Sequence, residues 1–161
     1  MGAAARRWAE LQSGRGIPPE ILETAPHDPW VHDPRDFRAP EVVADTPSRD
    51  AGLELLGEGG SVLDVGCGGG DAAFALAGPM TRATGTDRQA DLGKVFAEGA
   101  RARGIPCATL HGSWPELGGS TGYHDVVVCH HVLHNVVELA PFLSALSAAA
   151  GRGVVVEMLP E

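Results

Sequence analysis

One segment restricts the possible folds of this chain more than any other. At residues 61–73, SVLDVGCGGGDAA joins an apolar run to four glycines in five positions. The apolar run around Asp64 is typical of a buried strand. Glycine loses more backbone freedom on folding than any other residue, so this cluster indicates a backbone that turns tightly or lies close to a ligand. Because ligands bind at the carboxyl ends of strands in open α/β sheets, the segment predicts a strand, a ligand-binding loop and a helix that begins at Asp71. A tight turn without a ligand is the alternative.

Strand and helix patterns alternate from residue 46 onward. Helices are expected at 46–56, 71–78, 89–104 and 139–150, and strands at 61–65, 81–87, 105–112, 124–130 and 151–159. This alternation predicts an α/β fold with a mainly parallel sheet and helices on both of its faces. Because crossovers between parallel strands are right-handed, the sheet is expected to be doubly wound and Rossmann-like.

The first 45 residues have a different character. Seven of the twelve prolines and two of the three tryptophans lie within the first fifty residues. Proline punctuation predicts irregular structure between short helices. Trp30 and Phe37 favour packing, because disordered segments are poor in aromatic residues. We therefore divide the chain into a helical and irregular lid or arm at 1–45 and a core domain at 46–161.

Charge and cysteine content narrow the class of protein. The formal net charge is -9 and no run of Lys or Arg is present, which argues against a nucleic-acid partner and against an anionic membrane surface. Cys67, Cys107 and Cys129 are scattered and form no CxxC pair. The N-terminal sequence lacks the apolar core of a signal peptide. A reduced, cytoplasmic protein is the expectation.

The spacing of the glycines tests which ligand the loop accepts. Counting GxGxxG from Gly66 places the third glycine at Asp71, and counting from Gly68 places it at Ala73. The dinucleotide pattern is therefore absent, which disfavours an NAD-dependent oxidoreductase. A pyrophosphate at the start of the helix would also be repelled by Asp71. The loop is expected to hold a ligand that has no phosphate near it.

Two carboxylates complete the predicted site. Asp64 lies beside the glycines and can accept hydrogen bonds from a cationic ligand, directly or through water. Asp87 ends the second strand of the core, 17 residues after Gly70. An acidic side chain at this place can accept hydrogen bonds from both ribose hydroxyls of a nucleoside. A turn or N-cap role for Asp87 is the alternative.

These motifs together resemble class I S-adenosylmethionine-dependent methyltransferases. Motif I of that family is (D/E)xGxGxG, and Asp64, Gly66, Gly68 and Gly70 match it residue by residue. TGTD resembles the second motif, HDVVVCHHVLHNV the fourth strand and its exit, and GRGVVVEM the fifth strand. The resemblance covers roughly residues 46–158, and segments such as TPSR and HGSWPEL resemble actinobacterial members.

The resemblance implies a fold, a cofactor and a reaction. The sheet order is expected to be 3-2-1-4-5, the cofactor S-adenosylmethionine, and the reaction methyl transfer to a small molecule. Such a transfer is a direct in-line displacement, so positioning supplies much of the rate. The cofactor-binding residues that we infer are Asp64, Gly66, Cys67, Gly68, Asp87, Arg88, Ser113, Trp114 and His130.

The positions after the third and fourth strands need separate interpretation. Ser113 stands where the family often has an acidic residue that contacts the adenine amino group. Trp114 either stacks on adenine or caps the core beside a proline. His130 and His131 are expected to line the cofactor and substrate entrance, and His131 is our candidate general base. The histidine cluster suggests a metal site, but no HExxH motif is present and no metal is predicted.

The end of the chain departs from the family pattern. The family sheet normally has seven strands, whereas this sequence ends soon after the fifth, at residues 151–159. The fifth strand is then an apolar edge, which favours association with another chain. We expect a fragment, self-association through this edge, or cover from the N-terminal segment. A truncated domain that binds the cofactor weakly or not at all is the alternative to an active enzyme.

Overall fold

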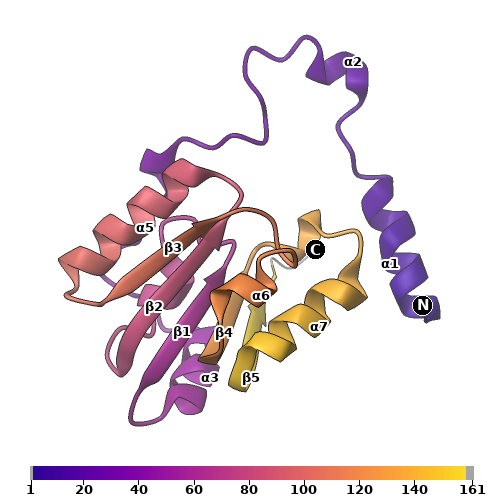
Figure 1. Cartoon of the computed structure of the whole chain (residues 1–161). Helices are drawn as coiled ribbons and strands as arrows, with labels where there is room; N and C mark the ends of the chain where they lie inside the picture. Colours follow the sequence, from indigo (N-terminus) through magenta and orange to yellow (C-terminus); the bar gives the residue numbers. More distant parts are fainter. Residues whose placement is uncertain (1, 159–161) are drawn as a thin grey trace.

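A computed structural model describes residues 2–158 of the chain (Figure 1). Its sheet contains β1 (Gly60–Val65), β2 (Met80–Asp87), β3 (Cys107–His111), β4 (His124–His130) and β5 (Ala150–Glu157). The strands lie in the order β3-β2-β1-β4-β5, and all four neighbouring pairs are parallel. The expected α/β fold and strand order are confirmed.

Helices cover both faces of the sheet. The main ones are α3 (Pro47–Leu56), α4 (Asp71–Phe74), α5 (Ala90–Ala102), α6 (Gly118–Thr121) and α7 (Leu139–Ala149). Successive side chains of β1 point to opposite faces. Val62 therefore belongs to the core shared with α3, α4 and α5, whereas Leu63 and Val65 belong to the core shared with α7.

The helix expected at 71–78 is shorter in the structure. α4 ends at Phe74, and the chain continues in tight turns in which the N–H groups of Leu76 and Ala77 each donate to the carbonyl three residues earlier. The chain must reverse within a few residues, because β2 begins at Met80 directly after Pro79. His130 and His134 share no helix, since His130 ends a strand and residues 133–135 form a 3-10 turn, η2 (Leu133–Asn135).

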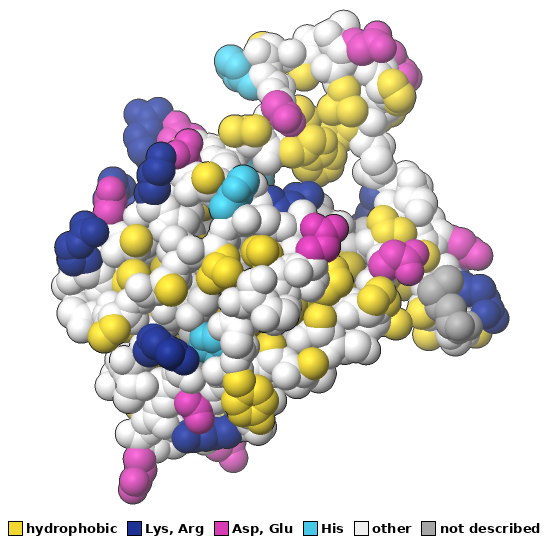
Figure 2. All heavy atoms as spheres, in the orientation of Figure 1, with side chains coloured by type: hydrophobic (Ala, Val, Ile, Leu, Met, Phe, Trp, Pro, Cys, Tyr) yellow, Lys and Arg dark blue, Asp and Glu magenta, His cyan; other side chains and the backbone are white. Residues whose placement is uncertain are grey.

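The N-terminal segment crosses the molecule as an arch. α1 (Ala3–Ser13) packs beside α7, and the indole Nε1 of Trp8 donates to the carbonyl of Val136 at 2.7 Å. The chain then passes through α2 (Pro19–Leu22) and returns to the body at η1 (Pro34–Phe37), which contacts α5 (Figure 1). Figure 2 shows hydrophobic side chains on the inner side of this arch, facing the hollow beneath it. The domain boundary at residue 46 stays a prediction.

Parallel pairing places the carboxyl ends of all five strands at one edge of the sheet. The glycine loop follows β1, Asp87 ends β2, and His130 and Glu157 end β4 and β5. The fold therefore brings chemistry-bearing residues from distant parts of the sequence to one place. Within residues 2–158, no helix is both long and apolar enough to cross a membrane.

Candidate functional site

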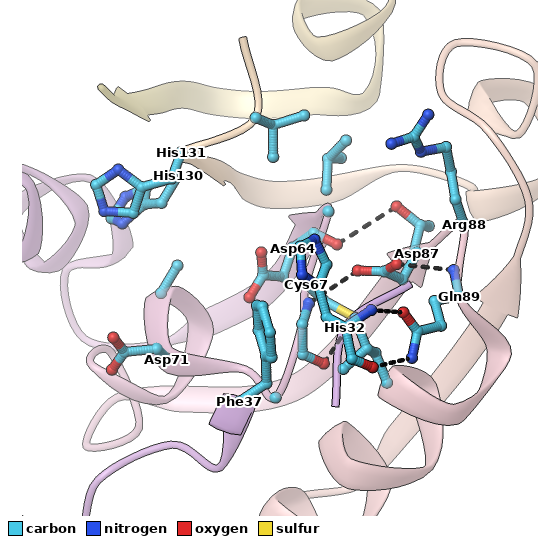
Figure 3. A pocket seen from close by; sticks show the side chains of 18 of the residues that line it. His32, Phe37, Asp64, Cys67, Asp71, Asp87, Arg88, Gln89, His130 and His131 are labelled. Carbon is cyan, nitrogen blue, oxygen red and sulfur yellow. Dashed lines mark hydrogen bonds between the residues drawn. The ribbon is translucent and has the colours of Figure 1, made fainter. Parts of the chain in front are cut away.

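A cavity of about 740 Å³ opens at this edge of the sheet, beneath the N-terminal segment (Figure 3). All ten residues inferred from the sequence line it: Asp64, Gly66, Cys67, Gly68, Asp87, Arg88, Ser113, Trp114, His130 and His131. The structure thus brings the predicted residues together, although the role of each toward a ligand stays a prediction.

The glycine loop needs glycine for conformational and steric reasons. Gly66, Gly68 and Gly70 have φ values of 73°, 49° and 92°, in the left-handed region that side chains disfavour. A Cβ on Gly66 would also lie 2.4 Å from Cγ2 of Val132. The N–H groups of Gly66 and Cys67 both donate to the Thr86 carbonyl, at 2.8 and 2.9 Å. The loop is therefore fixed against the end of β2, and Gly66, Cys67, Gly68 and Gly69 all line the cavity.

Asp87 links the glycine loop to the start of α5. Its Oδ2 accepts a hydrogen bond from the Gly68 N–H at 3.0 Å, and its Oδ1 accepts one from the Gln89 N–H at 2.9 Å. A carboxylate has about four lone-pair positions, so each oxygen can accept a further donor. The predicted ribose role and the alternative turn role are compatible in this geometry.

Asp64 lies beneath the loop rather than on its surface. Its side chain is buried, and Oδ2 accepts a hydrogen bond from the Ala73 N–H at 3.1 Å. Burial raises the pKa of Asp64 to about 7, against the opposing effect of the Ala73 hydrogen bond. The charges of Asp87 and Asp71 raise this pKa further. Asp64 therefore holds the first turn of α4 in place and keeps its proton up to about neutral pH.

Cys67 and Trp114 each contact both the cavity and the core. The Cys67 thiol lies in the core beneath the loop, and burial raises its pKa well above the usual range. A neutral thiol of this kind is a packing group. The Trp114 indole packs against the core shared with α7, and its Nε1 donates to the Phe142 carbonyl at 3.4 Å. Since Trp114 also lines the cavity, capping the core and facing a ligand are compatible.

His130, His131 and Glu157 form a second polar group on the far side of the cavity. His131 Nε2 lies 3.2 Å from Glu157 Oε1, and His130 Nδ1 lies 3.9 Å from Glu157 Oε2. The Ser48 hydroxyl also donates to Glu157. Burial lowers the pKa of His130, while the charge of Glu157 opposes this effect. His131 has a φ of 57°, a strained conformation that is frequent at functional sites.

No metal site is found among residues 2–158, because no group of three or more His, Cys, Asp or Glu side chains is arranged to hold an ion.

Glu157, Arg49, Phe37 and Gln89 also line the cavity and were not among the site residues inferred from the sequence. Glu157 had a usable signal, because it ends a strand at the same sheet edge as Asp87. Arg49 lies in α3, and its Nε is buried without a hydrogen-bond partner among the described residues. Phe37 contacts the glycine loop and Gln89 contacts His32, and both contacts join segments that are far apart in the sequence. No local pattern marks such contacts.

Comparison with known proteins supports the interpretation of the fold and the loop. Residues 62–153 match the family model described as a methyltransferase domain. The ubiquinone biosynthesis O-methyltransferase of Methylococcus capsulatus is 35% identical over 96 residues, which are 59% of this chain and 40% of that protein. The chain thus spans about two fifths of the length of this curated relative.

Solved structures share the architecture. Magnesium protoporphyrin IX methyltransferase from Synechocystis, with bound SAM, matches with a TM-score of 0.53 and 26% identity over 67% of this chain and 52% of its own. A precorrin 8W decarboxylase from Methanobacterium thermoautotrophicum matches with a TM-score of 0.57 and 22% identity over 83% of this chain and 71% of its own, which shows the fold alone. The family model covers more than half of the chain and includes the glycine loop, Asp87 and β4. The chain therefore belongs to the methyltransferase domain family, as the resemblance of its motifs implies.

Proposed function

We propose that this chain binds S-adenosylmethionine in the cavity and methylates a hydroxyl group of a small molecule. The observation that carries the proposal is the geometry of the loop. Three left-handed glycines face a carboxylate at the end of the neighbouring strand, in a cavity of about 740 Å³. The matched family and the SAM bound to a relative support the choice of cofactor.

The residues around the cavity fit this cofactor. Asp87 has lone pairs available for ribose hydroxyls, and Trp114 offers an apolar face for the adenine. Arg49 also lines this cavity, and its guanidinium, which pairs with Asp45 at 3.0 Å, is the proposed partner of the carboxylate of the methionine part. When bound, S-adenosylmethionine supplies an electrophilic methyl group on a positively charged sulfur.

The acceptor is proposed to bind on the side of His131 and beneath the arch. Donation from Nε2 of His131 to Glu157 leaves Nδ1 as a proton acceptor, and the carboxylate stabilises the imidazolium that results. Nδ1 of His131 would take the proton that the acceptor hydroxyl loses when the bound cofactor supplies its methyl group. Trp30 and Val31 are exposed and line the cavity, which favours an acceptor with an apolar or aromatic body. The O-methyltransferase relative supports oxygen as the acceptor atom.

Calorimetric titration with S-adenosylhomocysteine tests the cofactor proposal. We expect a dissociation constant in the micromolar range and no heat with NAD. Asp87→Ala should weaken binding at least tenfold, a loss of about 1.4 kcal/mol. Asp91→Ala removes an exposed carboxylate from the same region and should leave binding unchanged. A flat titration with folded wild-type protein would overturn the proposal, and unchanged binding by Asp87→Ala would assign Asp87 to the turn alone.

A further inference from the structure

Gly69 lies within the glycine loop but has a different requirement from its neighbours. Its φ is outside the left-handed region, so the loop conformation itself accepts a side chain at this position. A Cβ on Gly69 would nevertheless lie 1.5 Å from the carbonyl oxygen of Phe37 and 3.2 Å from Cγ1 of Val95. The close approach of the Phe37 backbone therefore requires glycine here. We call residues 28–40, which include Phe37, the strap.

A second contact fixes the strap at its other end. The side-chain amide of Gln89 pairs with both backbone groups of His32: Oε1 accepts from the His32 N–H at 2.9 Å, and Nε2 donates to the His32 carbonyl at 2.7 Å (Figure 3). Arg103 donates to the Pro40 carbonyl at 2.9 Å and holds the end of the strap against α5. The strap is thus fastened by its backbone at three points.

Asp87 connects the two main docking points. The Asp87 carboxylate accepts one hydrogen bond from the N–H of Gly68, the residue before Gly69, and another from the N–H of Gln89. The carboxylate proposed to hold the ribose therefore also holds the loop and the turn on which the strap sits. Trp30, His32 and Phe37 of the strap line the same cavity. A ligand on Asp87 consequently lies between the loop and the strap.

From these contacts we infer that the strap is a closing element of the cofactor site, docked on Gly69 and Gln89, and that it must lift before the cofactor can leave. This inference rests on the proposed function for the identity of the ligand, but not for the docking itself. The motif glycines allow the left-handed conformations of the loop, and Gly68 and Gly69 both lie against Phe37 without a side chain of their own between loop and strap. Exchange of the cofactor is then slow while the strap is docked and fast while the strap is lifted.

Limited trypsin digestion without ligand tests the docking. Cleavage after Arg38 releases a fragment that begins at Ala39, and its rate reports how often the strap lifts. Gly69→Ala adds one methyl group that collides with the strap, and we expect at least tenfold faster cleavage. Gly78→Ala is the matched control, because a Cβ there meets nothing within 4 Å. Gln89→Ala removes the second docking point from a partly exposed side chain and should also accelerate cleavage. Equal rates for wild type and both variants would overturn the inference.

The dissociation rate of S-adenosylhomocysteine tests the coupling. Both variants should release it at least tenfold faster than wild type and Gly78→Ala. Because each variant removes one contact of the same strap, their effects on the docking free energy add, and the double variant should release the ligand faster than either single variant until the strap is fully lifted. Unchanged release rates in both single variants would overturn the coupling. If wild type binds no S-adenosylhomocysteine at all, the proposed cofactor is wrong, while the digestion still decides whether the strap docks.

Discussion

Replacing Asp64 with asparagine tests whether the buried Asp64 side chain beneath the glycine loop is held as the neutral carboxylic acid. The pKa of Asp64 is raised from 3.8 to about 7 by burial. The unfolded chain therefore releases this proton near pH 4, whereas the folded chain keeps it up to about pH 7. Stability contributed by Asp64 is present at low pH and is lost as the pH rises, because the unfolded state binds fewer protons.

The size of the effect follows from this difference in pKa. Between pH 5 and pH 7, folding must retain a proton that the unfolded chain has lost. Each pH unit costs about 1.4 kcal/mol, so the two units amount to about 3 kcal/mol. The asparagine side chain has nearly the same shape, and its amide oxygen can accept the Ala73 N–H, but it does not titrate. The stability of Asp64→Asn relative to wild type should therefore improve by about 3 kcal/mol between pH 5 and pH 8.

Urea denaturation at pH 5 and pH 8 measures this change, and other titrating groups largely cancel because they are common to both proteins. Asp71→Asn is the matched control: it removes an exposed carboxylate from the same cavity, at the first turn of α4. Its effect should stay below about 1 kcal/mol. Stability curves of wild type and Asp64→Asn that run parallel between the two pH values would refute the reasoning.

Two further predictions concern the rest of the sheet. His124 is buried against the Thr84 hydroxyl at 2.8 Å, and burial lowers its pKa below 6.5. Arg82 lowers this pKa further, while the Gly122 hydrogen bond and the charge of Asp125 raise it. The unfolded chain then takes up a proton that the folded chain resists, so the His124 contribution to stability is lost as the pH falls below about 6.5. His124→Gln should be less sensitive than wild type to acid between pH 7 and pH 5.5 in urea denaturation, and equal sensitivity would contradict this. β5 is one of the two edge strands of the described sheet, and its Val156 is partly exposed. We expect self-association through this edge, measured by light scattering, and its loss in Val156→Lys because a lysine blunts strand pairing; a wild-type monomer at every concentration would contradict it.

Much of the fold was predictable because it depends on local patterns. The apolar run around Asp64 marked β1, and the weaker strand pattern that ends at Asp87 marked β2. The glycine spacing excluded a dinucleotide-binding loop. The α4 boundary was not predictable from its alanine-rich sequence. Helix propensity continues past Phe74, but the turn into β2 overrides it.

The α/β architecture and the loop between β1 and α4 could be predicted from periodicity and from glycine conformation, which act over a few neighbouring residues. The resemblance of the motifs to a known family added further residues, and ten of the residues that line the cavity were inferred in these two ways. The contact between Glu157 and His131, and the docking of the N-terminal segment on Gly69 and Gln89, exist only in the folded chain. Both join residues that lie far apart in the sequence, and the docking uses backbone groups of Phe37 and His32 that every residue possesses, so no sequence pattern predicts these contacts.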